Sequence, residues 1–401
     1  MVQTDYIHVP YGKAVYDEPE IEAVNKVLRS TTQMGKHVRE MEERVAKLYD
    51  KRYGIMVNSG SSALYLAAEL MDFPKGSEII TPALTFSTTV APLVKKGWIP
   101  AFVDVEEGTF NTDASKVEAM ITPNTKAMVI PNLIGNLPDW ARLREIADRH
   151  NLFVLEDSAD TIGAEINGQS SGRFCDMSTT SFYGSHIINC AGNGGMLCVN
   201  TEAFYNRGRL LRSWGRSSSL FVESEAIENR FNVEVDGIPY DAKFVFEEPG
   251  FNIEPAELGA AFGLVQLDNL AWNIDTRTEN YRRMREFFSQ WEEFFILPKQ
   301  LPNSRTGWLA FAITIRETAP FIRRDLQIFL EKRNIQTRTV FTGNILRQPG
   351  FKNVAHKASP DGYPESDKVM RGGMLLACHH GLNEAQLNHV MESVSAFMEA
   401  V

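Results

Sequence analysis

Residues whose side chains or backbone could do chemistry gather in four short segments of the sequence. The first covers residues 58–63 and reads Asn-Ser-Gly-Ser-Ser-Ala, after an apolar run and at the start of a helical pattern. Glycine lets the backbone approach a ligand closely, and the free N–H groups at a helix start favour phosphate. The segment therefore predicts a phosphate-binding turn, and an ordinary helix N-cap with a serine turn is the alternative.

The second segment places carboxylates directly after another apolar run. Residues 155–160 read Leu-Glu-Asp-Ser-Ala-Asp. Carboxylates just beyond a buried strand line the crevice in which α/β sheets bind ligands. A carboxylate in that place can keep the nitrogen of a pyridine ring protonated, which turns the ring into an electron sink. A solvated turn that caps the next helix is the alternative.

The third segment ends on a histidine, and the fourth precedes a long helical stretch. Residues 181–186 read Ser-Phe-Tyr-Gly-Ser-His, and a glycine-rich loop follows at 191–195. Imidazole exchanges protons near neutral pH, so His186 is a candidate acid or base, although most lone histidines are not catalytic. Residues 249–255 read Pro-Gly-Phe-Asn-Ile-Glu-Pro, which alone predicts only a loop and a helix start.

The elements that must position these segments follow an alternating pattern between about residues 53 and 200. Short runs rich in Val and Ile predict strands at 54–57, 78–83, 100–105, 127–131, 152–155, 179–183 and 195–199. Amphipathic segments such as 61–71 and 140–150 predict helices between them. This alternation predicts an α/β fold with a mainly parallel sheet and helices on both faces.

The C-terminal third predicts a second, smaller unit. Residues 257–291 read as one long helix without proline, 308–315 as a strand and 322–333 as a helix. We expect a large domain over residues 1–274 and a smaller C-terminal α/β domain over residues 275–401, linked by the long helix.

Composition restricts the classes of function. The chain has 401 residues and a formal net charge of −10, which argues against a nucleic-acid partner. The N-terminus lacks a secretory pattern, and no run approaches the roughly 18 apolar residues that would span a membrane. The four cysteines form no CxxC pair, which favours a reducing cytoplasm over a disulfide framework or a zinc ribbon.

The order and spacing of the four segments resemble the DegT-type sugar aminotransferase and dehydratase family of pyridoxal phosphate (PLP) enzymes. The resemblance extends over almost the whole chain and includes residues 85–89, 102–105, 133–136 and 336–338. It implies the aspartate-aminotransferase fold, PLP fold type I. The chain is most similar to the branch of nucleotide-linked 4-keto-6-deoxy-hexose 3-dehydratases. His186 stands where the family usually has lysine, and residues 341–349 resemble that branch's stretch.

The resemblance implies a role for each matching residue. The cofactor phosphate would be held by Gly60, Ser61 and Ser181, and Ser59 would also belong to the cofactor site. Phe86 would stack on the pyridine ring, Asp157 would pair with the ring nitrogen, Asp160 would lie near the ring hydroxyl, and His186 would be the acid/base. Asn252 would reach the cofactor phosphate of the neighbouring subunit, which implies a homodimer with shared active sites. Arg338 and Arg347 are the preferred candidates to bind the nucleotide diphosphate.

Histidine in place of lysine implies a particular reaction. Imidazole cannot form the covalent link that a lysine amine makes with the aldehyde cofactor. The pyridoxamine phosphate (PMP) form would therefore accumulate, and the C3 hydroxyl of the sugar would leave as water while His186 moves the proton. Such dehydration belongs to 3,6-dideoxysugar biosynthesis, as for lipopolysaccharide O-antigen. A nucleotide-sugar aminotransferase and a non-catalytic relative are the alternatives.

Departures from the resembled branch refine the expectation. One subgroup carries an iron–sulfur cluster, with cysteines after a Ser-Trp-Gly-Arg-like stretch. Here residues 213–216 are followed by three serines, and Ala159 occupies the remaining cysteine place, so we expect no cluster and L-glutamate as the amine donor. Asn193 stands where an acid is usual, and Ile187 where a second histidine is common, which bears on the proton inventory.

Overall fold

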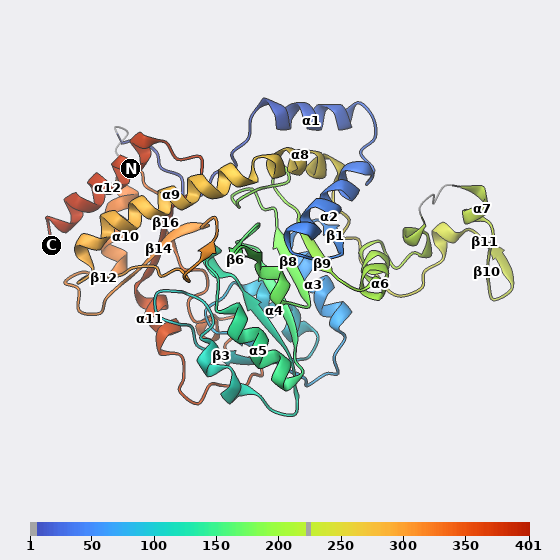
Figure 1. Ribbon diagram of the computed structural model, residues 1–401, viewed down its shortest axis with the longest axis horizontal. Helices are drawn as coiled ribbons and strands as arrows, with labels where there is room; N and C mark the ends of the chain where they lie inside the picture. The colour runs from blue at the N-terminus through green and yellow to red at the C-terminus, as the bar shows by residue number, and fades with distance from the viewer. Residues whose placement is uncertain (1–5, 222–225) are drawn as a thin grey trace.

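The computed structural model describes residues 6–221 and 226–401, and its centre is a seven-stranded sheet (Figure 1). The strand order is β1-β9-β8-β5-β4-β2-β3. The strands are β1 (Tyr53–Val57), β2 (Glu78–Pro82), β3 (Ile99–Val103), β4 (Thr125–Pro131), β5 (Phe153–Ser158), β8 (Met177–Ser181) and β9 (Gly195–Val199). Only β9 runs antiparallel to its neighbours β1 and β8. The predicted mainly parallel sheet is confirmed, because each predicted apolar run coincides with a strand.

Helices cover both faces of this sheet. On one face α3 (Gly60–Met71) and α6 (Glu202–Arg212) bury residues such as Leu66 and Leu211 against Ile55 and Leu197. The other face packs against α5 (Trp140–His150), α2 (Lys36–Leu48) and α8 (Glu257–Asp268). Strands buried on both sides explain why the sequence shows continuous apolar runs there. α4 (Ser87–Lys95) follows β2, and α1 (Glu18–Leu28) lies along α8.

A second sheet lies in the C-terminal part of the chain. Its order is β12-β14-β16-β15, with every pair antiparallel. The strands are β12 (Phe295–Ile296), β14 (Ala310–Ile315), β15 (Arg338–Thr339) and β16 (Gly373–Ala377), and the accompanying helices are α10 (Arg323–Lys332), α11 (Pro364–Gly372) and α12 (Glu384–Met398). The N-terminal segment joins this unit through a bridge between Val9 and Ile335. The division at residues 274 and 275 stays a prediction.

The prediction of one continuous helix over residues 257–291 is wrong. α8 ends at Asp268, and α9 (Leu270–Phe288) begins after Asn269, whose φ of −95° and ψ of 1° leave the helical range. Asparagine competes for backbone hydrogen bonds and so favours helix ends. α9 extends from the large sheet to the C-terminal unit (Figure 1).

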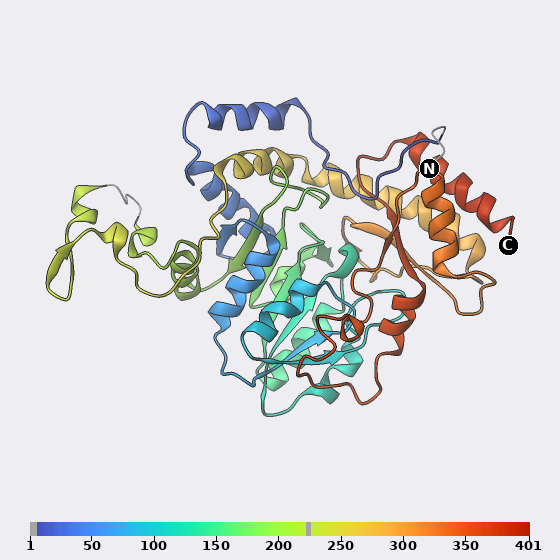
Figure 2. The ribbon, with the colours of Figure 1, turned by 180° about the vertical axis from the view of Figure 1, so that it is seen from behind.

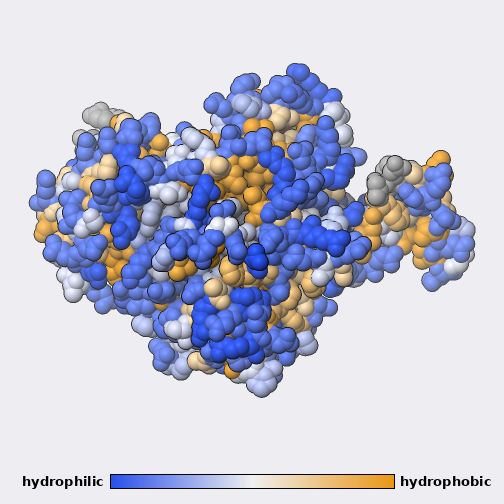
Figure 3. All heavy atoms as spheres, in the orientation of Figure 1, coloured by the Kyte–Doolittle hydropathy of each residue, from blue (hydrophilic) through white to orange (hydrophobic). Residues whose placement is uncertain are grey.

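An arm formed by residues 214–221 and 226–250 extends away from the body of the molecule (Figures 1 and 2). It carries α7 (Ile227–Arg230) and the hairpin of β10 (Val233–Val235) and β11 (Ile238–Tyr240). The space-filling view shows hydrophobic side chains among hydrophilic ones on this arm (Figure 3). In the part of the chain that the structure describes, no helix is both long and apolar enough to cross a membrane.

Candidate active site

A cavity of about 520 Å³ lies at the carboxyl ends of β1, β5 and β8. Open α/β sheets bind ligands at this edge because the strand ends and helix starts meet there. Eight of the predicted site residues line it, namely Ser59, Gly60, Ser61, Phe86, Asp157, Asp160, Ser181 and His186. Segments that are more than a hundred residues apart in the sequence therefore meet in one place.

The start of α3 forms one end of the cavity. Ser59 is the N-cap, and its hydroxyl accepts a hydrogen bond of 3.1 Å from the backbone N–H of Ser62. Gly60 packs tightly against the end of β8, because an added Cβ would lie 2.6 Å from Cβ of Ser181. An added Cβ on Gly195 would lie 2.3 Å from the carbonyl carbon of Ser59. Two glycines thus bring a helix N-terminus and the Ser181 side chain together, an arrangement suited to a phosphate.

Asp157 lies buried at the end of β5. Its carboxylate accepts hydrogen bonds from the hydroxyl of Thr89 at 2.7 Å and from the backbone N–H of Ala159 at 3.1 Å. Burial raises the pKa of Asp157 above its ordinary value in spite of these two bonds. No lysine, arginine or histidine nitrogen of the described chain lies within 4 Å of this carboxylate, so a bound cation such as a protonated pyridine nitrogen would complete the pair.

Asp160 lines the same cavity and is less buried than Asp157. Burial, with a smaller contribution from the charge of Asp157, raises the pKa of Asp160 to about 7, although the backbone N–H of Ile134 donates to it at 2.9 Å. Ile134 holds a φ of 62°, a strained conformation for a β-branched residue. The strain is maintained by backbone bonds from outside the segment, including that from the N–H of Leu309 to the Ile134 carbonyl.

His186 lies on the loop that connects β8 to β9. Its Nδ1 is 3.4 Å from the carbonyl oxygen of Ser181. A carbonyl only accepts, so Nδ1 carries the hydrogen and Nε2 keeps its lone pair. Burial lowers the pKa of His186 to about 4; the Ser181 carbonyl opposes this shift and the charge of Arg277 adds to it. The imidazole is therefore neutral at pH 7 and able to accept a proton.

Comparison with known proteins identifies the family. The sequence model of the DegT/DnrJ/EryC1/StrS aminotransferase family matches residues 15–395. The chain belongs to this family. It is 34% identical over 402 residues to a dTDP-4-dehydro-2,6-dideoxy-D-glucose 3-dehydratase from Saccharopolyspora spinosa, covering 97% of this chain and 86% of that relative.

Solved structures of the family share the fold. An E. coli GDP-4-keto-6-deoxy-D-mannose-3-dehydratase with bound hydrated PLP has a TM-score of 0.87 at 27% identity, covering 97% of this chain and 99% of that one. A GDP-4-keto-6-deoxymannose-3-dehydratase with a trapped PLP-glutamate geminal diamine has a TM-score of 0.86 at 25% identity, covering 96% and 100%. The predicted family and the predicted aspartate-aminotransferase-like fold are confirmed.

Three of the predicted site residues do not line the cavity at the strand ends. Asn252 is exposed at the base of the arm, where it forms a backbone bridge with Ser213. Arg338 is exposed, but its guanidinium lies 5.3 Å from the ring centroid of Tyr11, which lines the cavity. Arg347 instead donates from Nε to Asp367 at 2.6 Å. Of these three residues, Arg338 is the one that contacts a residue lining the cavity of the same chain.

Sequence reasoning missed several residues that line the cavity. Tyr11 arrives on the N-terminal segment, and Leu309 arrives at the start of β14. Phe341 holds a φ of 40° and packs its ring edge-on against Phe86, at 5.8 Å between centroids. Tyr11 and Leu309 have no local signal, and Phe341 stood in the segment 341–349 of the resemblance, but its contact with Phe86 joins parts of the chain that are hundreds of residues apart. Thr89 stood in a segment of the family resemblance, but its bond to Asp157 needed the fold.

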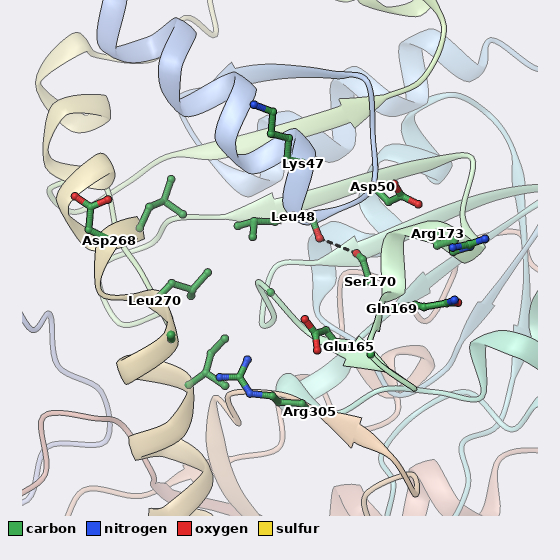
Figure 4. Close-up of a pocket in the computed structure, with 15 residues that line it drawn as sticks. Lys47, Leu48, Asp50, Glu165, Gln169, Ser170, Arg173, Asp268, Leu270 and Arg305 are labelled. Carbon is green, nitrogen blue, oxygen red and sulfur yellow. Dashed lines mark hydrogen bonds between the residues drawn. The ribbon is translucent and has the colours of Figure 1, made fainter.

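A second cavity of about 610 Å³ lies where the end of α2 faces the start of α9 (Figure 4). Charged side chains of both signs surround it, among them Lys47, Arg173, Glu165 and Asp268. It contains none of the predicted site residues. The cavity at the strand ends is therefore the candidate active site.

Proposed function

We propose that this protein is a PMP/PLP-dependent 3-dehydratase of a nucleotide-linked 4-keto-6-deoxy-hexose. The observation that carries the proposal is the identity of the base in the cavity. His186 faces the same space as the buried Asp157 and the start of α3, and none of the described residues that line the cavity is a lysine. A family site without a lysine lacks the amine that a transaminase uses, and it keeps a group that moves protons.

The residues present fit the cofactor. The N–H groups of α3 with Ser181 suit its phosphate, and the buried Asp157 suits its ring nitrogen. Phe86 is 50% exposed beside Phe341, which leaves a ring face free for stacking. When bound, the cofactor supplies an amine for the sugar ketone and a ring that accepts an electron pair. Both similar dehydratase structures contain PLP or a PLP adduct, which supports this assignment.

His186 does the proton transfer in this proposal. With the cofactor bound, the neutral Nε2 of His186 would accept the proton that the cofactor side of the site gives up, and the protonated imidazole would return a proton to the C3 hydroxyl so that it leaves as water. The pKa of about 4 keeps the resting imidazole unprotonated at pH 7. Asp157 would balance the positive charge of a protonated ring nitrogen, which would lower the pKa of the Asp157 carboxyl when the cofactor binds.

L-glutamate is the proposed amine donor, and no iron–sulfur cluster is proposed. A PLP-glutamate adduct in a similar dehydratase structure supports the first point. The four cysteines are free and buried in different parts of the core, Cys175 under α5 and Cys378 in the C-terminal unit, with Cys190 and Cys198 between α2 and α8. Cluster ligation needs thiolates that converge, which these do not.

A homodimer with shared active sites is part of the proposal. The arm exposes large apolar side chains, among them Ile227, Phe231, Ile238, Tyr240, Phe244 and Phe246. A group of that size on one projecting element indicates a covered surface in the working protein. Asn252 at the base of the arm is exposed, as a residue that reaches a neighbouring subunit must be. A second copy of the chain is the proposed occupant.

Mass spectrometry of the products tests the function. The protein is incubated with PLP, L-glutamate and a panel of dTDP-, GDP- and CDP-linked 4-keto-6-deoxy-hexoses. We expect a product that has lost one oxygen and kept its ketone. A product in which the ketone has become an amine would instead favour a nucleotide-sugar aminotransferase. Absence of both products would count against the substrate class and favour a non-catalytic relative.

Two variants test the role of His186. His186→Asn removes the base and should reduce dehydration by at least about 100-fold, within the range for loss of a general base. His186→Lys restores the usual family residue and should abolish dehydration while allowing some amine transfer. Unchanged dehydration in both variants would show that another group moves the proton.

A further inference from the structure

The buried face of α9 carries three polar side chains that hold the backbone around the active site. Asn273, Arg277 and Asn280 are spaced by four and three residues, so they lie on one face of the helix. All three are buried. Asn273 donates to the carbonyl of Ile187 at 3.0 Å, and Asn280 donates to the carbonyl of His379 at 3.1 Å. Helix α9 therefore contacts both the His186 loop and the C-terminal unit through hydrogen bonds.

Arg277 makes the most contacts of the three and is 0% exposed. One Nη donates to the carbonyls of Trp308 at 3.0 Å and Leu309 at 3.2 Å. The other Nη donates to the carbonyl of His186 at 3.2 Å, and Nε donates to Nδ1 of His380 at 3.1 Å. A single rigid guanidinium thus joins the His186 loop to the start of β14, where Leu309 also lines the cavity.

The positive charge of Arg277 has no carboxylate partner. Over residues 6–221 and 226–401, no Asp or Glu oxygen lies within 4 Å of its guanidinium. His380 accepts from Arg277 and is neutral, because burial and then the charge of Arg277 lower the pKa of His380 to about 3. An unpaired buried charge costs free energy, and a neutral side chain would avoid that cost. The charge and the fork of bonds together indicate a role at the adjacent site.

We propose that Arg277 is the positioning residue of His186. This proposal rests on the proposed function, in which His186 moves the proton. By holding the carbonyl of His186 and those of Trp308 and Leu309, the guanidinium sets the distance between the imidazole and the opposite cavity wall. Proton transfer depends steeply on such placement, and an error near 1 Å can reduce the rate about 100-fold.

The charge of Arg277 adds a second effect on the same imidazole. The titratable groups around His186 are Arg277 on α9, Tyr11 on the N-terminal segment, Tyr183 on its own loop, and Asp157 and Asp160 after β5. Arg277 is the positive one among them. It helps to hold the pKa of His186 near 4, after burial, and so keeps the base unprotonated well below neutral pH.

Kinetics of two variants test the proposal. Arg277→Lys keeps the charge but loses the fork, so kcat should fall by about 10- to 100-fold while KM for the nucleotide sugar stays within about threefold. Arg277→Gln also loses the charge, so the acid limb of kcat/KM should move up by roughly one pH unit, a shift absent in Arg277→Lys. The control is Arg282→Lys, on the exposed face of α9 in contact with Glu279, which should leave both constants unchanged.

A measurement that needs no turnover separates this inference from the proposed function. Diethyl pyrocarbonate acylates histidine only when the imidazole is neutral, so the extent of modification of the His186 peptide, measured by mass spectrometry against pH in the cofactor-free protein, reports the protonation of His186. The midpoint should be higher in Arg277→Gln than in the wild-type protein, whatever reaction the enzyme performs. Thermal unfolding shows whether each variant folds. If Arg277→Gln does not fold, the kinetics of Arg277→Lys alone test the proposal. A kcat of Arg277→Lys within about twofold of wild type, or an unmoved midpoint in a folded Arg277→Gln, would overturn the proposal.

Discussion

Asp157 and Asp160 are three residues apart, yet they differ in burial and in the hydrogen bonds that their carboxylates accept. The Asp157 carboxylate is buried and accepts two hydrogen bonds, whereas the Asp160 carboxylate accepts one from the Ile134 backbone and has a pKa of about 7. Neither has a basic partner within 4 Å in the described chain. In the proposed function, the two carboxylates would therefore face different parts of a bound ring.

Asp157→Asn should weaken cofactor binding and activity. The amide retains the bond to Thr89 but cannot balance a protonated ring nitrogen, so turnover should fall by about 100-fold or more. Absorbance titration of the protein with PMP measures the affinity, and product mass spectrometry measures the turnover. Ser170→Ala changes a side chain outside the cavity and serves as the control. Equal PMP affinity in Asp157→Asn and wild type would contradict the assignment.

Asp160 predicts a dependence of stability on pH. Its folded pKa of about 7 exceeds the unfolded value of about 3.9, so its favourable contribution is present below pH 4 and is lost as the pH rises through 7. Asp160→Asn cannot ionise, and its oxygen can still accept from Ile134. The cofactor-free variant should therefore melt a few degrees above wild type at pH 8, and the difference should vanish near pH 4. Calorimetry at both pH values checks this, and a gain that is equal at both would count against the raised pKa.

At the scale of elements, the proposed phosphate site depends on the close contact between α3 and the end of β8. Gly60→Ala places a Cβ 2.6 Å from Cβ of Ser181, so the helix start or the serine must shift. We expect the affinity for PLP to fall by at least about tenfold, because phosphate contacts at a helix start depend on close approach. Gly350→Ala is the matched control, since nothing lies within 4 Å of its added Cβ. Similar PLP affinity in the two variants would show that the α3 start tolerates the change.

At the scale of the whole molecule, the projecting arm is difficult to explain in a monomer. Ile238 on β11 and Ile322 before α10 are both 62% exposed, but only Ile238 belongs to the apolar group of the arm. Ile238→Asp should therefore raise the dimer dissociation constant by at least about tenfold, whereas Ile322→Asp should leave it unchanged. Sedimentation velocity over a range of concentrations measures both. A monomeric wild-type protein would contradict the shared active site.

The sequence by itself determined the features that depend on local periodicity and short segments. Apolar runs predicted the strands of the large sheet, and the pattern over residues 140–150 predicted α5 with its observed bounds. The segments that carry Gly60, Asp157 and His186 were found because each follows a strand, and strand ends of a parallel sheet meet at one edge.

Only the tertiary structure decided the partners of these residues. The bonds from Thr89 to Asp157, from Ile134 to Asp160 and from Arg277 to His186 join distant segments, and no local pattern encodes such pairs. The ion pair of Arg347 with Asp367 also joins distant segments. It engages a guanidinium that the sequence analysis had proposed for binding the nucleotide diphosphate. The pKa shifts of Asp157, Asp160 and His186 were likewise not predictable from the sequence, because burial is their largest cause and burial is a property of the folded chain.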